Sequence, residues 1–426
     1  MIKTSTKWRS VKMPFLILCC ACVLLSGVVQ PLFGETPSPA ENSQSDNTEP
    51  WPEKLGSRTT WERIAYFPGA VVYLPLRITF AASKETLAFV DDKRIIPRTK
   101  DFITSDDGRY GLRARYANRT GGGPKFFYKG LLSPQSKLTT SATFGLERKQ
   151  QYQLRMKRVS LFGDAVLSQY LVRYRRLTNE SYFGLGPESL KADESDFSHE
   201  QATVEATFDI GLGGRILLDT VLGFDLNDII ESSIAETLSE LEEQIPMGRL
   251  QVGLRYDLRN TPGNPSNISE ALLAAGVFQD FSDGDFSFWR ASADVTYCLH
   301  LFYERVLALR LAAEIREPFS GHEIPFYYLS EIGTQSTVRG YTRGRFRDQE
   351  MVLASVEYRY PVREQMDAVL FADVGQVADD IFNDISGDDL AFGYGGGFRI
   401  WGEDGLIINL IFAKSEDRFR FFFGLE

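Results

Sequence analysis

Histidine and cysteine are scarce in this sequence. Its 426 residues include three histidines, His199, His300 and His322, and four cysteines. So few imidazoles and thiols leave little material for a metal centre, and we expect no metal site. No serine or aspartate is set around the histidines in a recognisable nucleophile arrangement. We therefore predict that the protein is not an enzyme, has no catalytic residues and uses no cofactor.

Basic residues are in deficit as well. Lys and Arg total 47 against 57 Asp and Glu, which gives a formal net charge of −10. A surface that binds nucleic acid needs clustered Lys and Arg to neutralise phosphates. The charge balance therefore argues against a nucleic-acid partner.

Long apolar runs are missing after the N-terminus. The single long apolar run, at the N-terminus, covers residues 13–29, has 17 residues and follows four basic residues, Lys3, Lys7, Arg9 and Lys12. We interpret residues 1–34 as a secretory signal peptide. A membrane anchor, which needs ~20 apolar residues, and a lipoprotein, suggested by the cysteines in the run, are the alternatives. Cleavage would leave Cys298 as the one cysteine, so the mature chain would hold no intrachain disulfide.

Two further segments precede residue 109. Residues 35–60 are rich in Pro, Ser and Glu and poor in apolar side chains, which predicts a disordered periplasmic leader. Residues 61–108 have a mixed composition with one apolar stretch. This short periplasmic segment would be either a small soluble cap or a stretch lying near the mouth of the following domain.

From residue 109 onward, apolar and polar residues alternate. In residues 250–259, for example, Leu250, Val252 and Leu254 alternate with Gln251 and Arg255. A half-buried soluble sheet would also alternate. However, the polar faces here carry both charge signs, the segments have roughly the 9–11 residues of a tilted membrane-spanning strand, and a signal peptide precedes them. The aromatic share of 13% suits girdles at the two membrane interfaces.

We therefore predict an all-β fold over residues 109–426: a transmembrane antiparallel β-barrel in the bacterial outer membrane. About sixteen strands are expected, and an even number is usual in such single-chain barrels. The predicted strands are residues 109–117, 124–131, 137–147, 150–161, 164–177, 199–210, 213–225, 247–258, 270–281, 286–298, 302–316, 349–362, 366–377, 389–401, 404–414 and 417–425. Short periplasmic turns alternate with long external loops, such as residues 178–198, 226–247 and 317–348. His199 and His322 fall in or beside external loops, and His300 falls in a periplasmic turn.

The external loop of residues 227–246 is strongly acidic. It contains six carboxylates and no basic residue, and its apolar residues recur at near-helical spacing. We predict a short amphipathic helix over the barrel mouth, serving either as a solvated lid or as a surface for a partner.

An ordered set of motifs runs through the C-terminal half. In chain order these are Tyr256-Asp257-Leu258-Arg259-Asn260, Val338-Arg339-Gly340-Tyr341, Ser355-Val356-Glu357-Tyr358-Arg359-Tyr360-Pro361, Phe371-Ala372-Asp373-Val374-Gly375-Gln376-Val377 and Tyr394-Gly395-Gly396-Gly397-Phe398-Arg399. With them, residues 108–426 resemble the BamA/TamA-like outer-membrane assembly and translocation barrels, also called bacterial surface antigens. The resemblance implies sixteen strands and a long external loop folded back into the lumen. It also implies that Arg339, at the loop tip, reaches carboxylates on the wall.

Alternation supports a specific set of partners for this loop tip. Val356 and Tyr358 would point outward and Glu357 inward, while Asp373 shares the inward face of the next strand with Gly375. Two carboxylates could then satisfy the forked guanidinium of Arg339. The tip residues Val338, Gly340 and Tyr341 would complete this loop clasp, with Gly340 allowing a tight backbone and Tyr341 wedged against the wall. The alternative is that Arg339 lies in water and the carboxylates simply line the lumen.

The resemblance also implies a function. Assembly members of the family carry periplasmic POTRA domains, and residues 61–108 are too short and too weakly patterned for one. The leading hypothesis is insertion or translocation of protein or lipid through a weak seam between the first and last strands. The seam residues would be Arg109, Tyr110, Leu112, Phe419, Phe421 and Phe423. Expected partners are outer-membrane lipid, and unfolded outer-membrane or secreted proteins or a periplasmic accessory protein. The alternative is a closed structural barrel or narrow passive pore, whose mixed-charge interior would select weakly between ions.

Overall fold

A computed structural model describes residues 104–105, 107–163, 165–234, 244–257, 269–282, 285–302, 304–363, 365–402 and 405–425. The predicted signal peptide, leader and nearly all of the N-terminal segment lie outside these ranges. So do residues 235–243 of the acidic loop and most of the turn after Tyr256. Within the described chain, no helix is long and apolar enough to cross a membrane.

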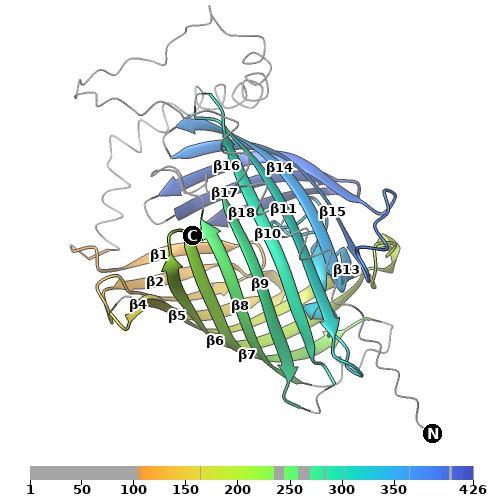
Figure 1. Cartoon of the computed structure of the whole chain (residues 1–426), viewed down its shortest axis with the longest axis horizontal. Coiled ribbons are helices and arrows are strands. Elements are labelled where there is room, and N and C mark those ends of the chain that lie inside the picture. Colours follow the sequence, from red (N-terminus) through yellow and green to blue (C-terminus); the bar gives the residue numbers. More distant parts are fainter. Residues whose placement is uncertain are drawn as a thin grey trace, which may run out of the picture. The chain divides into compact units, whose positions relative to one another are not determined.

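The described residues form a closed antiparallel barrel of sixteen strands, with a separate two-stranded hairpin, β12 and β13 (Figure 1). Each barrel strand pairs with its neighbour in sequence, except that β11 pairs with β14 across the hairpin, and β1 meets β18. The barrel strands are β1 (Tyr110–Ala117), β2 (Gly121–Lys129), β3 (Lys137–Phe144), β4 (Gln150–Leu161), β5 (Val166–Tyr182), β6 (Ser195–Gly213), β7 (Ile216–Ser232), β8 (Ile245–Asp257), β9 (Glu270–Asp280), β10 (Phe288–His300), β11 (Val306–Pro318), β14 (Glu350–Arg363), β15 (Met366–Ala378), β16 (Ala391–Gly402), β17 (Gly405–Ser415) and β18 (Phe419–Leu425). The predicted fold class and strand number are confirmed.

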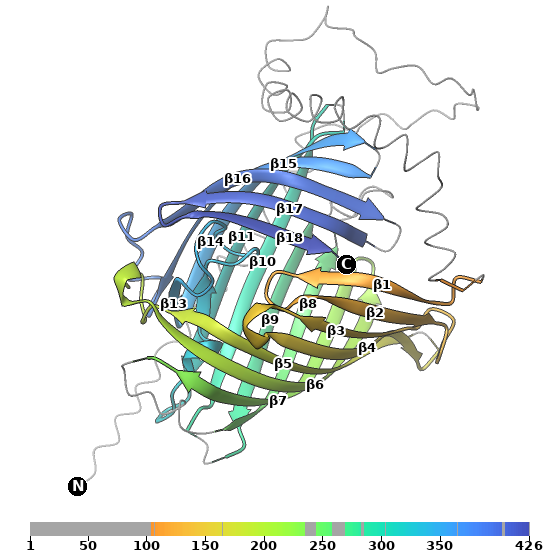
Figure 2. The same cartoon turned by 180° about the vertical axis from the view of Figure 1, so that it is seen from behind.

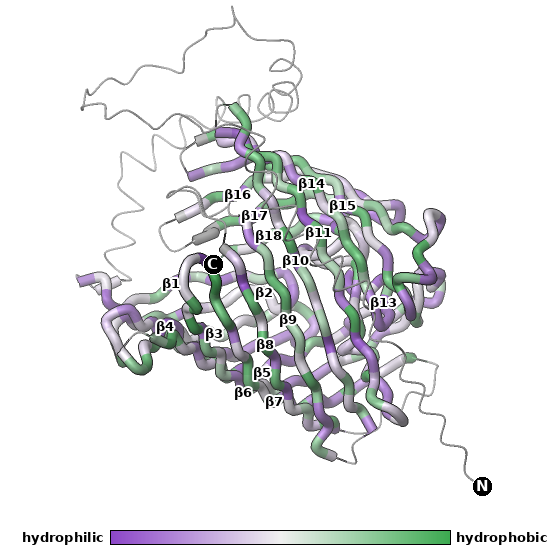
Figure 3. Tube along the Cα trace, viewed as in Figure 1, coloured by the Kyte–Doolittle hydropathy of each residue, from purple (hydrophilic) through white to green (hydrophobic). Residues whose placement is uncertain are grey.

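The two faces of each strand meet different surroundings. Along β8, Leu250, Val252 and Leu254 are exposed on the outer surface, whereas Gly253 is buried. The same alternation of apolar and polar residues recurs from strand to strand (Figure 3). Because the outer face meets lipid and the inner face encloses polar groups, a period of two is the pattern that this architecture requires.

Three strands extend farther than predicted. β5 and β6 reach Tyr182 and Ser195, and β7 continues to Ser232, so parts of two predicted loops are strand. The predicted helix is wrong for residues 227–232, which pair with β6 through Phe197↔Ser232 and Asn227↔Gln201. In this region Ile229 is buried with Phe197 and Phe326, and the strand ladder satisfies the backbone groups that a helix would have paired internally.

The segment between β11 and β14 folds into the lumen, as the resemblance implied. It contains a short 3₁₀ turn (Phe326–Tyr328), β12 (Ser330–Ile332) and β13 (Phe346–Asp348). Its apolar residues are buried against inward-facing side chains of the wall. Val338 and Ile332 pack with Met351 and Leu353, and Tyr328 packs against Phe278 and Phe288.

The junction between the first and last strands differs from the other junctions. β1 pairs with β2 along its whole length, and β18 pairs with β17 throughout, but β1 and β18 share one pair of Cα partners, Tyr116↔Leu425. Figure 2 shows the C-terminal end of β18 meeting β1. Among the described residues, no further Cα partners join β1 to β18. Outside the ladder, Thr104 bridges to Gly111 on the edge of β1 away from β2.

This junction leads to a prediction for hydrogen exchange. Half of the amides in residues 110–115 and 419–423 face away from the paired neighbour, so we expect them to exchange faster than amides of residues 352–358, which lie between two partners. Mass spectrometry of the barrel in lipid nanodiscs would measure both rates. Equal protection at the two places would contradict the prediction.

Candidate functional site

The tip of the inner loop is buried against the barrel wall. Val338 is fully buried, and Tyr341 is 4% exposed beside Ala391 of β16 and Val377 of β15. The backbone N–H of Phe392 donates to the Tyr341 hydroxyl at 3.4 Å, and the Tyr341 ring meets Phe346 edge-on at 5.5 Å. Packing from both sides of Arg339 therefore fixes the place of its backbone.

Arg339 lies over the inner face of β14 and β15. Its Nε and Nη2 donate to the two oxygens of Asp373, each at 2.7 Å, and its backbone N–H donates to Asp373 Oδ2 at 3.1 Å. Its Nη1 donates to Glu357 Oε2 at 3.0 Å. The guanidinium also stands 3.5 Å above the ring of Phe371. Forked donation to one carboxylate, with a second carboxylate and an aromatic face, uses the planar geometry that only arginine offers.

The charges in this cluster are close to balanced. Glu357 accepts from Arg359 Nε at 2.7 Å and from both Nη atoms of Arg399 at 2.6 and 2.9 Å, in addition to Arg339. Ser355 donates to Asp373 at 2.6 Å. Three arginines thus surround two carboxylates that are 6% and 1% exposed. Burial works to lower the pKa of Arg339, but the hydrogen bonds and charges of Asp373 and Glu357 outweigh it and raise that pKa.

Glycines make room for the loop tip. A Cβ at Gly393 on β16 would lie 2.0 Å from the Arg339 carbonyl oxygen, and one at Gly375 on β15 would lie 3.1 Å from Val338. Gly340 has φ of +106°, and a Cβ there would meet the backbone of Lys414 and Ser415 at 2.8 Å. Backbone contact on β16 and β17 therefore depends on residues without side chains.

A second set of contacts holds the loop after its tip. Arg345 donates to Asp417 in the turn before β18 at 2.8 Å, and to the Ser189 carbonyl between β5 and β6 at 2.8 Å. Arg343 and Arg347 both pair with Glu331 of β12. The loop therefore contacts both the β17–β18 turn and the segment between β5 and β6.

The structure brings all seven residues expected at the clasp into one region, and it adds others. Ser355, Arg359, Arg399, Arg345 and Asp417 were not singled out from the sequence. Alternation could have found Ser355 and Arg359, because they share the inward face of Glu357. Arg399, which donates to Glu357, is the last residue of the motif Tyr394-Gly395-Gly396-Gly397-Phe398-Arg399. Arg345 and Asp417 carry no such signal, because their contact depends on the path of the loop.

The residues expected at the seam lie around the β1–β18 junction but do not all contact across it. Tyr110, Leu112, Phe419 and Phe421 are exposed on the outer surface, and Arg109 precedes β1. Of these six residues, Phe423 contacts the other side of the junction in the part of the chain that the structure describes. Its ring lies 5.2 Å from the ring of Tyr116, and its N–H donates to Asn118 Oδ1 at 3.1 Å.

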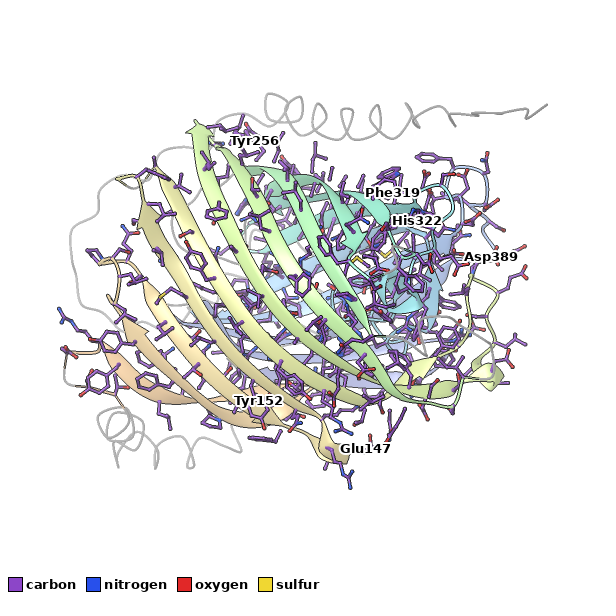
Figure 4. The ribbon with its side chains drawn as sticks, turned by 90° about the horizontal axis from the view of Figure 1, so that it is seen from below. Glu147, Tyr152, Tyr256, Phe319, His322 and Asp389 are labelled. Carbon is purple, nitrogen blue, oxygen red and sulfur yellow. The ribbon has the colours of Figure 1, made fainter. Side chains whose placement is uncertain are left out.

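The histidines lie apart from one another. His199 lies within β6 rather than at its edge, buried against Tyr327 with its ring 3.2 Å from Asn227 Oδ1. Figure 4 labels His322, in the segment after β11, toward the same end of the barrel as Asp389 and away from Tyr256. His300 ends β10. Among the residues that the structure describes, no three His, Cys, Asp or Glu side chains are grouped to hold a metal ion.

Comparison with known proteins places this geometry in a family. The Omp85 superfamily domain matches residues 111–424. Among solved structures, the crystal structure of BamA from Haemophilus ducreyi lacking POTRA domains 1-3 is similar, with a TM-score of 0.56 at 14% identity over 74% of this chain and 70% of that chain. CdiB from Escherichia coli has a TM-score of 0.50 at 11% identity over 74% of this chain, and CdiB from Acinetobacter baumannii 0.47 at 13% over 74%.

This chain spans 62% of the Escherichia coli CdiB chain and 58% of the Acinetobacter baumannii one. A search of curated proteins finds no match. At these identities the structural likeness shows the fold alone, whereas the family domain covers most of the chain. It confirms the resemblance that the ordered motifs indicated. The chain therefore belongs to the Omp85 superfamily, a group of bacterial outer-membrane β-barrels.

Proposed function

We propose that the protein assists insertion or translocation at the outer membrane, and that it acts by opening laterally between β1 and β18. The observation that carries this proposal is the single Cα pair, Tyr116↔Leu425, at a junction whose neighbours are paired along whole strands. Few ladder hydrogen bonds would have to break for these two strands to separate. The substrate would be an unfolded outer-membrane or secreted protein, or a lipid of the outer membrane.

The strand edges at this junction suit a templating role. An unpaired edge presents a row of N–H and C=O groups to which another strand can add. In a bilayer such groups are costly when they lack partners, so an incoming strand would be stabilised there. The bridge from Thr104 to Gly111 covers part of the β1 edge. A substrate strand would displace this contact.

The inner loop is placed to influence the junction. Gly340 packs on the backbone of Lys414 and Ser415, and Arg345 pairs with Asp417, so the loop contacts the end of β17 and the turn that leads into β18. The Arg339 cluster holds the same loop to β14 and β15. We infer that the loop clasp holds the final hairpin in position and that its release favours opening.

A disulfide across the junction tests the lateral opening. Tyr116→Cys with Leu425→Cys joins Cα partners, whose separation in an antiparallel pair suits a disulfide. We expect the purified barrel in proteoliposomes to accelerate insertion of an unfolded outer-membrane protein when the pair is reduced. Oxidation should remove that acceleration, because the seam can no longer part.

A matched control comes from Tyr152→Cys with Tyr174→Cys, which are Cα partners on β4 and β5. Oxidation of this pair should leave the rate unchanged. Undiminished insertion by the oxidised seam variant would rule out lateral opening. A steady single-channel conductance without any insertion activity would instead favour the passive pore.

Variants of the loop clasp test the role of Arg339. Removal of one member of a buried ion pair costs about 3–5 kcal/mol, because the partner charge stays buried. Glu357 keeps Arg359 and Arg399, so Asp373 is the carboxylate that Arg339→Ala leaves without an arginine. We expect Arg339→Ala to release the loop and allow trypsin to cleave after Arg343, Arg345 and Arg347. Asp373→Asn in the same chain should restore part of the resistance.

Arg255→Ala serves as the control for these variants. Arg255 is an inward-facing arginine at 3.9 Å from Asp219 and is partly exposed, so its loss should not change cleavage. If Arg339→Ala leaves trypsin resistance and heat-modifiable migration as in the unaltered protein, the loop is not held by the clasp.

Asp348 in β13 makes docking of the loop dependent on pH. Burial raises the pKa of its carboxyl from 3.8 to about 6, and the nearby carboxylates of Asp379, Glu350 and Asp384 add to this. Since the pKa is higher in the docked loop than in a released one, protonation of Asp348 favours the docked loop. This stabilisation of the docked loop is complete below about pH 4 and is lost as the pH rises through 6. We expect loop amides to be better protected at about pH 5 than at about pH 7.5, after correction for intrinsic exchange. Asp348→Asn should remove the difference, and an opposite trend would contradict this assignment.

A further inference from the structure

A cavity of about 480 Å³ lies inside the barrel, between the wall and the inner loop. Nine of its lining side chains are arginines, whereas three are carboxylates, Asp294, Glu314 and Glu331. This excess of positive charge stands inside a chain whose formal net charge is −10. Arginine stays protonated in proteins, so the excess cannot be relieved by loss of protons.

Carboxylates in the lining and behind it compensate only part of this charge. Glu180 pairs with Arg119, and Glu205 and Asp225 pair with Arg249. Glu314 serves both Arg290 and Arg316, and Glu331 serves both Arg343 and Arg347. With Asp294, this makes six carboxylates for nine arginines.

Arg173 and Arg175 on β5 appear in none of the ion pairs found among the described residues. Arg173 donates to the hydroxyl of Thr203 at 3.3 Å. Asp225 and Glu205 act on Arg173 from a distance, but both carboxylates already pair with Arg249.

Buried donors of these arginines also lack acceptors. Within the described chain, Nε of Arg173, Arg175, Arg249, Arg290 and Arg316 and Nη1 of Arg347 have no hydrogen-bond partner. Arg347 is 5% exposed, so solvent scarcely reaches its side chain. Gln201 Oε1, which also lines the cavity, is an unpartnered acceptor in the same part of the chain, but the unpartnered donors outnumber it. Because buried donors are almost always satisfied in folded proteins, such a group around a single cavity suits a ligand that brings acceptors.

The inner loop supplies hydroxyl groups to the same cavity. Thr334, Ser336 and Thr337 line it, and Arg310 Nη1 donates to the Ser336 carbonyl at 2.6 Å. Forked guanidinium groups together with hydroxyls form the donor set that binds phosphate oxygens. The volume suits a small molecule rather than a folded domain.

We propose that this cavity binds a compact polyanion with two or more phosphate groups, either a soluble polyphosphorylated molecule or the head group of a phosphorylated lipid. Arg175 and Arg173 would contact it from the wall, and the hydroxyls of residues 334–337 would contact it from the loop. These hydroxyls directly precede Val338 and Arg339, so the bound anion stabilises the docked loop. The proposal does not depend on lateral opening, because binding is measured without any insertion assay.

Calorimetry on the full chain, folded in a neutral detergent at low salt, tests the soluble source with tripolyphosphate as the probe. We expect saturable binding to one site that weakens as salt is added, and at least tenfold weaker binding by Arg175→Gln. Arg255→Gln removes the same charge from an inward position outside the cavity lining and should bind as the unaltered protein does.

Nanodiscs test the lipid source. One set contains a diphosphorylated glycolipid in phosphatidylcholine and the other contains phosphatidylcholine alone. Specific retention of the glycolipid, lost in Arg175→Gln, would support the proposal with a lipid head group as the ligand.

A third measurement uses the unaltered protein and holds even if Arg175→Gln fails to fold. Tripolyphosphate, or the glycolipid, should slow trypsin cleavage after Arg343 and Arg345, because the ligand holds the loop. Absence of saturable binding from both sources up to about 1 mM would overturn the proposal. So would equal weakening by Arg175→Gln and Arg255→Gln, or binding of a polyglutamate peptide without binding of tripolyphosphate.

Discussion

Backbone hydrogen bonds in a bilayer have no water to replace them, and this constraint shapes the whole barrel. Along most of β14 and β15 it is met by pairing on both sides, over residues 350–359 of β14 and 366–375 of β15. At the junction of β1 and β18 it is met by one Cα pair, by the bridge from Thr104 to Gly111 and by the Asn118 side chain bound to the Phe423 amide. Closure is thus achieved with much less pairing at one position than elsewhere. The free energy needed to separate two neighbouring strands is therefore lowest at this junction.

Closing sixteen strands also encloses a lumen, and its walls carry charged side chains because the outer face must be apolar. The protein handles these charges in two ways. Around Arg339, three arginines and two carboxylates satisfy one another, and glycines on β15 and β16 let the loop come close enough to do so. Around Arg175, arginines outnumber carboxylates, and several donors find no acceptor among the residues that the structure describes. The first region is complete as it stands, whereas the second has the composition of a site for an anion.

The sequence predicts the barrel well because a period of two is imposed by lipid outside and polar groups inside, so all sixteen strands could be located. The prediction from sequence fails where the strands extend beyond the contrast between lipid outside and polar groups inside. Residues 178–182, 195–198 and 227–232 extend the strands of β5, β6 and β7, yet their polar residues and the spacing of Ile230 and Ile234 favoured loop and helix. Alternation could place Glu357 and Asp373 on one inner surface, but the path of the loop was implied by family resemblance. The Arg345 contact with Asp417 joins residues 72 positions apart and has no local pattern.

The inner loop connects two regions of the wall that the strand ladder alone would leave independent. Its tip is fixed to β14 and β15 by Arg339, and its later part is fixed to the β17–β18 turn by Arg345. Between these points, Gly340 lies directly on the backbone at the end of β17. A displacement of β18 away from β1 would therefore strain the loop, and a loop held more firmly would resist that displacement. Since the cavity hydroxyls of residues 334–337 belong to the same loop, any anion bound there would act on the junction through contacts already present in the fold.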